Sequence, residues 1–247
     1  MVRATVAILG LMAAILAGCA ASTSGSASEL PRGSPASDQS APVMSPQTQL
    51  RYVALGDSYT IGTSVSVDAR WPNGLVAALA GDLTALDLVA NLGVNGYTSR
   101  DVIDVELPQL DSLRPEFVTL LIGVNDVVQG VPAETYRDNV VRILDDLVGR
   151  VGALRIIVVT TPDYTVTPAG ADYGNPTQQA AGIRENNSIL STLASARGIT
   201  VVDIYDISLG AATDRSLVAS DGLHPSGAQY ERWVARIAPV AAGLIGP

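Results

Sequence analysis

The sequence predicts an α/β fold in which helices cover both faces of a five-stranded parallel sheet. From Arg51 onward, short β-branched apolar runs alternate with longer segments of helical period, a pattern typical of parallel strands buried on both faces. The chain has 247 residues, 47% of them hydrophobic, which is enough for one sizeable core. We therefore expect one folded domain over residues 51–247.

Each element follows from its local pattern. The predicted strands are the apolar runs Tyr52–Gly56, Leu86–Asn91, Phe117–Ile122, Arg155–Thr160 and Thr200–Ile204. The predicted helices are Pro72–Ala80, Ser99–Leu107, Glu134–Val148, Gln178–Ala196 and Pro225–Leu244. Start and stop signals support these bounds, namely Ser99 as an N-cap, Pro132 before the third helix, Gly198 after the fourth and Pro225 in the first turn of the last.

The N-terminus has the features of an export signal. Arg3 is followed by the apolar run Ala4–Leu16, which is too short to span a membrane comfortably. It leads into Leu16-Ala17-Gly18-Cys19, which resembles the lipobox of bacterial lipoproteins, where the cysteine is acylated and becomes the first mature residue. We expect residues 1–18 to be a signal peptide, Cys19 to be lipidated, and the protein to be extracytoplasmic on a bacterial membrane. An uncleaved signal anchor and ordinary secretion with a free thiol are the alternatives.

A polar segment follows Cys19. Residues 20–49 are rich in Ser, Ala, Pro, Gly and Gln, and such a composition cannot offset the entropy cost of folding. We expect residues 19–50 to be a flexible linker with an end-to-end distance of about 30 Å. The linker would hold the domain just off the membrane surface.

Charge and composition exclude several functions. Without Arg3 the chain has 14 basic and 24 acidic residues, a formal charge of −10, which argues against nucleic acid and against anionic lipid head groups as partners. His224 and Cys19 are the only histidine and the only cysteine, so a zinc centre of the usual kind is excluded. No Walker-type phosphate loop is present. We expect no metal and no cofactor.

Polar residues follow four of the predicted elements, where an open parallel sheet places its ligand site. Strand one leads into Asp57-Ser58, strand two into residues 91–96 and strand three into Asn125-Asp126. The loop after strand five leads to Asp221 and His224, just before the last helix. The loop Pro162–Thr177, rich in Pro, Gly and Tyr, is a candidate substrate loop.

These residue types suit nucleophilic catalysis. A serine hydroxyl needs a base to take its proton, and a neutral imidazole serves near neutral pH, so we pair Ser58 with His224. Asp221 lies three residues earlier and can accept the other ring N–H, which orients the base. Each motif alone also fits a structural role, since Asp57-Ser58 can form a turn and Asp221 can cap the final helix.

Together the four segments resemble the SGNH (GDSL-like) hydrolase family, whose blocks supply Ser, Gly, Asn and His in this order. Here they are Ser58, Gly93, Asn125 and His224, and the first block has Tyr59 where the family name has Leu. The resemblance implies a three-layer, flavodoxin-like sandwich. It also implies an oxyanion hole formed by the backbone N–H groups of Ser58 and Gly93 and the side-chain amide of Asn125.

The expected function is that of a serine ester hydrolase that forms an acyl-enzyme on a small acyl ester. The resembled family includes carboxylesterases, lysophospholipases, thioesterases and carbohydrate deacetylases. Acyl transfer from the same site, or a non-catalytic tethered binding lipoprotein, are the alternatives. We expect Val127, Val128 and Leu223 to line an acyl pocket, and Asp57 and Asp126 to stiffen the loops.

Overall fold

The sheet consists of five parallel strands in the order β2-β1-β3-β4-β5. The computed structural model describes residues 48–246, so the predicted signal peptide, Cys19 and most of the predicted linker lie outside the described residues. The strands are β1 (Thr48–Gly56), β2 (Thr84–Asn91), β3 (Phe117–Leu121), β4 (Ile156–Val159) and β5 (Thr200–Val202). This order is the one found in flavodoxin-like, doubly wound sheets.

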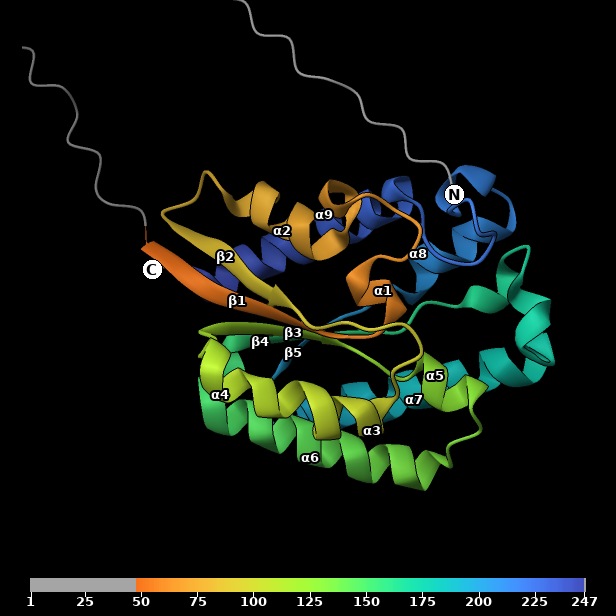
Figure 1. The fold of residues 1–247 in the computed structure, drawn as a ribbon, viewed down its shortest axis with the longest axis horizontal. Coiled ribbons are helices and arrows are strands. Elements are labelled where there is room, and N and C mark those ends of the chain that lie inside the picture. The colour runs from red at the N-terminus through yellow and green to blue at the C-terminus, as the bar shows by residue number, and fades with distance from the viewer. Residues whose placement is uncertain (1–47, 247) are drawn as a thin grey trace, which may run out of the picture. The chain divides into compact units, whose positions relative to one another are not determined.

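Helices cover both faces of the sheet (Figure 1). The α-helices of the described residues are α1 (Ser58–Ile61), α2 (Trp71–Leu79), α3 (Ser99–Asp101), α4 (Leu110–Leu113), α5 (Val124–Val128), α6 (Ala133–Val151), α7 (Pro176–Ser195), α8 (Tyr205–Leu209) and α9 (Gly227–Ile245). Helices α2 and α9 pack on one face, and α3, α4, α6 and α7 lie on the other. Three-layer α/β architecture is thereby confirmed.

Successive β1 residues face opposite helical layers, as the two-residue period of a strand requires. Tyr52 and Ala54 pack into the core beneath α2 and α9, where Trp71 and Trp233 are completely buried. Val53 and Leu55 pack into the second core, beneath α6 and α7. Burial on both sides explains why the stretch Tyr52–Leu55 of this strand is continuously apolar.

Several predicted bounds differ from the structure. Strand β1 begins at Thr48 because residues 48–51 pair with β2, so the predicted linker extends into the sheet by three residues. The predicted helix Ser99–Leu107 is a composite of α3, a π-helix (Val102–Glu106), a 3₁₀ turn (Leu107–Gln109) and α4.

Two predicted helix starts are wrong. Thr98, and not Ser99, is the N-cap of α3, where it forms a capping box with Asp101. Helix α9 begins after Ser226, whose side chain accepts a hydrogen bond from Gln229 N. Pro225 precedes the helix and instead forms an antiparallel bridge with Val218.

Over residues 48–246, no helix is both long and apolar enough to cross a membrane.

Candidate active site

The turn from β1 into α1 presents Ser58 at the carboxyl end of the sheet. Gly56 has φ +148°, and a Cβ atom there would lie 2.2 Å from the Leu121 carbonyl oxygen, so this position requires glycine. Asp57 then caps α1, because its Oδ1 accepts a hydrogen bond from Tyr59 N at 2.9 Å. Ser58 is therefore held at the first position of a short, rigid helix.

The loop before α9 positions His224. The ring Nδ1 lies 2.6 Å from Asp221 Oδ2, which confirms the predicted contact between these side chains. The loop backbone is fixed because Ala219 N donates to the His224 carbonyl oxygen at 2.8 Å. Since Ser226 caps α9, the alternative role of Asp221 as the cap of the final helix is excluded.

Asp221 accepts several further hydrogen bonds. Its Oδ1 accepts from Leu223 N at 2.9 Å and from His224 N at 3.0 Å, and its Oδ2 accepts from Ser64 Oγ at 2.7 Å. Partial burial opposes ionisation, but these donors together hold the pKa of Asp221 well below its ordinary value. A permanent carboxylate therefore faces the imidazole.

Asn125 reaches the site from the segment that follows β3, the strand next to β1. It lies in the first turn of α5, directly after β3, and its Nδ2 donates to the Tyr97 carbonyl oxygen at 2.8 Å. An amide carries two N–H groups, so a second donor remains on the nitrogen. Strands β1 and β3 flank the point where the strand order reverses, which is where doubly wound sheets bind ligands.

The prediction for Gly93 is wrong. Its N–H donates to Asn91 Oδ1 at 3.1 Å, and a Cβ atom at Gly93 would lie 2.7 Å from backbone atoms of Asp57 and Ile61. Gly93 thus allows the loop to pack against α1. Gly96, three residues later, lines the cavity at Ser58 and has φ +83°. No hydrogen bond from the N–H of Ser58 or of Gly96 to another protein group occurs among the described residues.

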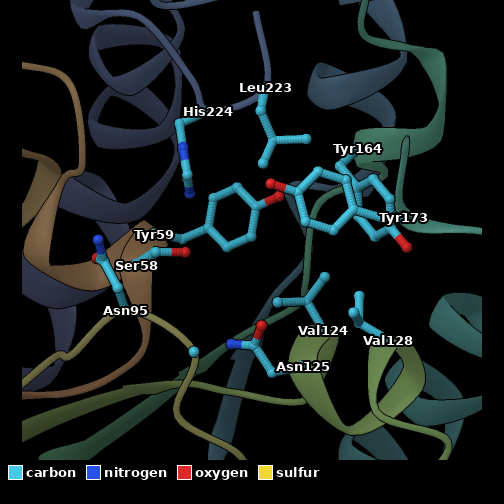
Figure 2. A pocket seen from close by; sticks show the side chains of 11 residues that line it. Ser58, Tyr59, Asn95, Val124, Asn125, Val128, Tyr164, Tyr173, Leu223 and His224 are labelled. Atoms are coloured by element: carbon cyan, nitrogen blue, oxygen red, sulfur yellow. The ribbon is translucent and has the colours of Figure 1, made fainter. Parts of the chain in front are cut away.

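One cavity of about 240 Å³ brings these groups together. Figure 2 shows the His224 ring pointing toward the Ser58 hydroxyl, with Asn125 on the other side of the cavity. No hydrogen bond joins Ser58 and His224 in the described part of the chain, and such contacts commonly tighten only with substrate. The lining residues are Ser58, Tyr59, Asn95, Gly96, Val124, Asn125, Val128, Tyr164, Tyr173, Leu223 and His224.

The residues that line the cavity differ in part from those predicted for the acyl pocket. Val128 and Leu223 line the cavity as expected, but Val127 does not, and its side chain lies against Gly182 of α7. Tyr164 and Tyr173 belong to the candidate substrate loop and form an edge-to-face pair with ring centroids 5.8 Å apart. The sequence indicated a tyrosine-rich substrate loop, but only the folded loop shows that these two side chains line the cavity.

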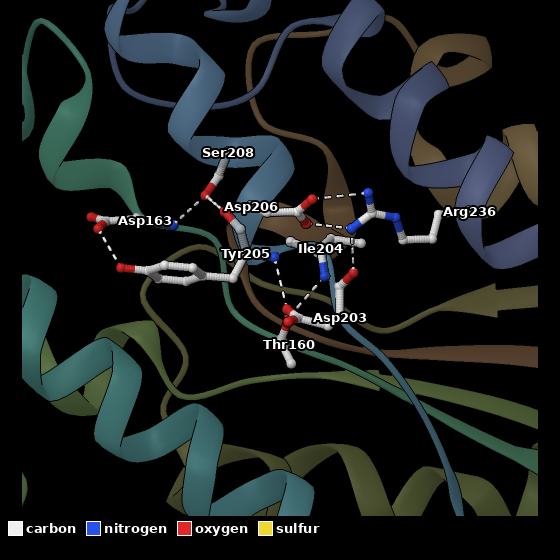
Figure 3. A network of polar contacts seen from close by, with 8 residues as sticks. All are labelled: Thr160, Asp163, Asp203, Ile204, Tyr205, Asp206, Ser208 and Arg236. Carbon is white, nitrogen blue, oxygen red and sulfur yellow. Dashed lines mark hydrogen bonds and ion pairs between the residues drawn. The ribbon is translucent and has the colours of Figure 1, made fainter.

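The substrate loop is anchored at its base by Asp163 (Figure 3). Its Oδ2 accepts a hydrogen bond from Tyr205 Oη at 2.8 Å, and Asp163 N donates to Ser208 Oγ at 2.8 Å. Further along the loop, Ala169 N donates to the carbonyl oxygen of Gly222 at 2.9 Å, and Gly222 lies between Asp221 and His224. The loop that carries Tyr164 and Tyr173 is thus held by hydrogen bonds at Asp163 and at Ala169.

Three buried carboxyl groups lie behind the site. Asp126 accepts hydrogen bonds from Ser99 N and Oγ at 2.9 and 2.5 Å, which fits its predicted role in stiffening a loop. Glu106, which the sequence analysis missed, accepts a hydrogen bond from Gly56 N at 3.0 Å. Burial raises the pKa of Asp57 to about 8 and that of Glu106 to about 9. Both are therefore mainly protonated at neutral pH.

A metal centre finds no support in the described residues, because they contain no group of three or more His, Cys, Asp or Glu side chains that could hold an ion.

Comparison with known proteins identifies relatives. The profile of the GDSL-like Lipase/Acylhydrolase family matches residues 54–232. An arylesterase of Vibrio mimicus is 29% identical over 102 residues, which are 40% of this chain and 48% of that protein. The chain thus matches about half the length of this relative.

Solved structures share the fold. A lipase/acylhydrolase from Enterococcus faecalis has a TM-score of 0.62 at 21% identity, over 80% of this chain and 98% of that chain. The acetylxylan esterase Axe2 from Geobacillus stearothermophilus has a TM-score of 0.60 at 19% identity, over 81% and 95% of the two chains. The family match spans more than half of the sequence and includes Ser58, Asn125 and His224, so the chain belongs to the GDSL-like lipase/acylhydrolase family.

Proposed function

We propose that the protein is a serine ester hydrolase that acts on small acyl esters through an acyl-enzyme. One observation carries the proposal: a single cavity is lined by a serine, by a histidine held by a carboxylate, and by the donor groups of Gly96 and Asn125. Ligand pockets commonly measure about 300–1,000 Å³, so a cavity of about 240 Å³ favours a small acyl group.

Each step of the reaction has a group to perform it. Ser58 Oγ attacks the carbonyl carbon while its proton passes to His224 Nε2, and Asp221 stabilises the resulting imidazolium. The backbone N–H groups of Ser58 and Gly96 and the second N–H of Asn125 stabilise the oxyanion, each at a typical worth of about 3 kcal/mol. Collapse of the intermediate expels the alcohol, which takes the proton from His224. Water then attacks the acyl-enzyme by the same route and releases the acid.

The relatives guide the choice of substrates. An arylesterase and an acetylxylan esterase are among the similar proteins, so p-nitrophenyl acetate and acetylated xylan should be assayed first. Transfer of the acyl group to an added alcohol or sugar is the competing outcome, and product analysis distinguishes it from hydrolysis.

Substitution of the nucleophile tests the proposal. Ser58→Ala should reduce p-nitrophenyl acetate hydrolysis to background and abolish labelling by an organophosphonate, because no hydroxyl remains to form the covalent adduct. Ser112→Ala, on the exposed surface of α4, is the control and should retain both. A metal chelator should leave the rate of p-nitrophenyl acetate hydrolysis by wild type unchanged. Labelling of another serine in folded Ser58→Ala would contradict the assignment.

We further propose that the domain is tethered outside the cytoplasm through an acyl group on Cys19. The support is the apolar run that ends in Leu16-Ala17-Gly18-Cys19 and the polar composition of the segment that follows. With a net charge of −10 after removal of the signal, the chain itself would not favour anionic membranes. The acyl chain would therefore supply the membrane affinity.

A further inference from the structure

A wall of three side chains separates the cavity at Ser58 from a second, much smaller one. Tyr59, Tyr164 and Leu223 line the cavity on one side and a void of about 10 Å³ on the other. Figure 2 shows the Tyr59 ring beside His224, with the rings of Tyr164 and Tyr173 beyond it. A void of this size holds at most about one water molecule. The wall therefore separates the cavity at Ser58 from a space too small for an acyl chain.

Tyr59 is a buried member of this wall, fixed by backbone hydrogen bonds and ring packing. Its N–H donates to Asp57 Oδ1 at 2.9 Å, and its carbonyl oxygen accepts from Tyr230 Oη at 3.0 Å. The ring packs 5.5 Å from the His224 ring and 6.4 Å from the Trp233 ring, measured between centroids, and Tyr59 is 3% exposed. It cannot swing aside without breaking this packing.

The far side of the wall is polar. The small void is lined by Asp163, Ser208 and Gln229 among others, and Gln229 Oε1 is buried without a hydrogen-bond partner in residues 48–246. Hydrocarbon placed there would exclude water from Gln229 Oε1 and offer that oxygen no hydrogen bond, at a cost typical of buried polar groups. Chain extension past the wall is thus opposed by both packing and polarity.

We propose that Tyr59 determines specificity by limiting the acyl chain to a few carbons. The inference rests on the proposed esterase function and adds its substrate class, short-chain acyl esters. Tyr59 directly follows the nucleophile, so an acyl group bonded to Ser58 begins next to its ring. Replacing the ring by a smaller aliphatic side chain opens a space bounded by Trp233, Tyr164 and Leu223, where further methylene groups can be buried.

The test compares wild type with Tyr59→Phe, Tyr59→Leu and Tyr59→Ala on p-nitrophenyl acetate, butyrate, hexanoate and octanoate. Wild type should prefer acetate or butyrate. In Tyr59→Leu and Tyr59→Ala the ratio of kcat/KM for octanoate to that for acetate should rise at least about tenfold, the lower limit for one methylene group in an apolar pocket. Tyr59→Phe keeps the ring and removes only the hydroxyl, so its ratio should stay near that of wild type.

Thermal melting of each variant establishes that it is folded, and if Tyr59→Ala does not fold, Tyr59→Leu decides. An unchanged ratio in folded Tyr59→Leu would overturn the inference while leaving the esterase assignment intact. A second series, alkyl acetates of rising alcohol length, should show the same preference in wild type and Tyr59→Leu. If the substitution changes only the preference among alkyl acetates, the alcohol and not the acyl chain lies against Tyr59, which would also overturn the inference. If wild type hydrolyses none of the esters, the proposed function itself fails.

Discussion

Asp221 is the residue proposed to orient the base, because its carboxylate accepts a hydrogen bond from the His224 ring. His224 Nδ1, Ser64 Oγ and the backbone N–H groups of Leu223 and His224 all point at its carboxylate. A folded-state pKa below the ordinary value means that the ionised form stabilises the fold above the ordinary Asp pKa, and that this contribution is lost as pH falls through the lowered pKa. Asp221 should therefore stay charged wherever the enzyme works.

Asp221→Asn should lower kcat by up to about 10⁴, as the comparable change in a Ser-His-Asp triad does. The amide disturbs the orientation of the imidazole and removes the charge that stabilises the imidazolium. For the second reason, the acidic limb of the kcat/KM profile should also move to lower pH. Kinetics from pH 5 to 8 would measure both effects.

Ser64→Ala is the matched control for this substitution. It removes a hydroxyl donor to the same carboxylate oxygen but leaves the charge in place, so its effect on kcat should be much smaller. Near wild-type kcat in Asp221→Asn would mean that the carboxylate only shapes the loop.

Among the elements of the fold, the turn between β1 and α1 depends on a side chain from the π-helix Val102–Glu106. Glu106 is completely buried and accepts a hydrogen bond from Gly56 N. Gly56 is the residue at which an added Cβ atom would clash with the Leu121 carbonyl oxygen. Its other oxygen, Oε1, has no hydrogen-bond partner among the described residues. Burial raises the pKa of this carboxyl group from 4.5 to about 9, so the folded state holds a proton that the unfolded chain releases near pH 4.5.

Glu106→Gln should make the free energy of unfolding less dependent on pH. Between about pH 4.5 and 9 the folded wild type binds up to one proton more than the unfolded chain, so its stability falls with rising pH by up to about 1.4 kcal/mol per unit. Glutamine keeps an acceptor for Gly56 N and does not ionise. The variant should therefore be more stable than wild type at pH 8, with a flatter curve in urea unfolding from pH 5 to 9.

Glu185→Gln, at an exposed position of α7, is the control. Its curve of unfolding free energy against pH should run parallel to that of wild type. If the curve of Glu106→Gln also runs parallel to that of wild type, Glu106 does not hold a proton in the folded state.

On the scale of the whole molecule, the doubly wound sheet gathers residues that are far apart in the sequence. Ser58 follows β1, Asn125 follows β3, and His224 precedes α9, yet all three line one cavity. Two layers of helices bury both faces of the sheet. The cavity at the strand ends is thus carried by a scaffold whose core does not depend on the catalytic residues.

The proposed tethering also concerns the whole chain, and Cys19→Ser tests it. Metabolic labelling with a fatty acid should mark wild type and leave Cys19→Ser unlabelled, because the thiol is the proposed acyl acceptor. Ser58→Ala should be labelled like wild type, which separates lipidation from catalysis. Equal labelling of wild type and Cys19→Ser, or labelling of neither, would rule out the lipoprotein proposal.

The sequence by itself determined the fold class and most residues of the candidate site. Apolar runs and helical periods are local properties, so the five strands were predicted and only their ends moved, as at Thr48. Ser58, Asn125, Asp221 and His224 could be chosen because each combines a reactive or donor side chain with a place after a strand or before the last helix. The order of parallel strands then brings such places to one edge.

Only the tertiary structure decided which neighbours complete the site. Gly93 and Gly96 belong to one short turn, and the turn geometry directs the first to Asn91 and α1 and the second to the cavity. Glu106 has the sequence pattern of a polar residue on a helix, yet it lies buried against Gly56. Tyr164 and Tyr173 meet the cavity through a long loop. Contacts between distant segments depend on how whole elements pack, and no local period or spacing records that packing.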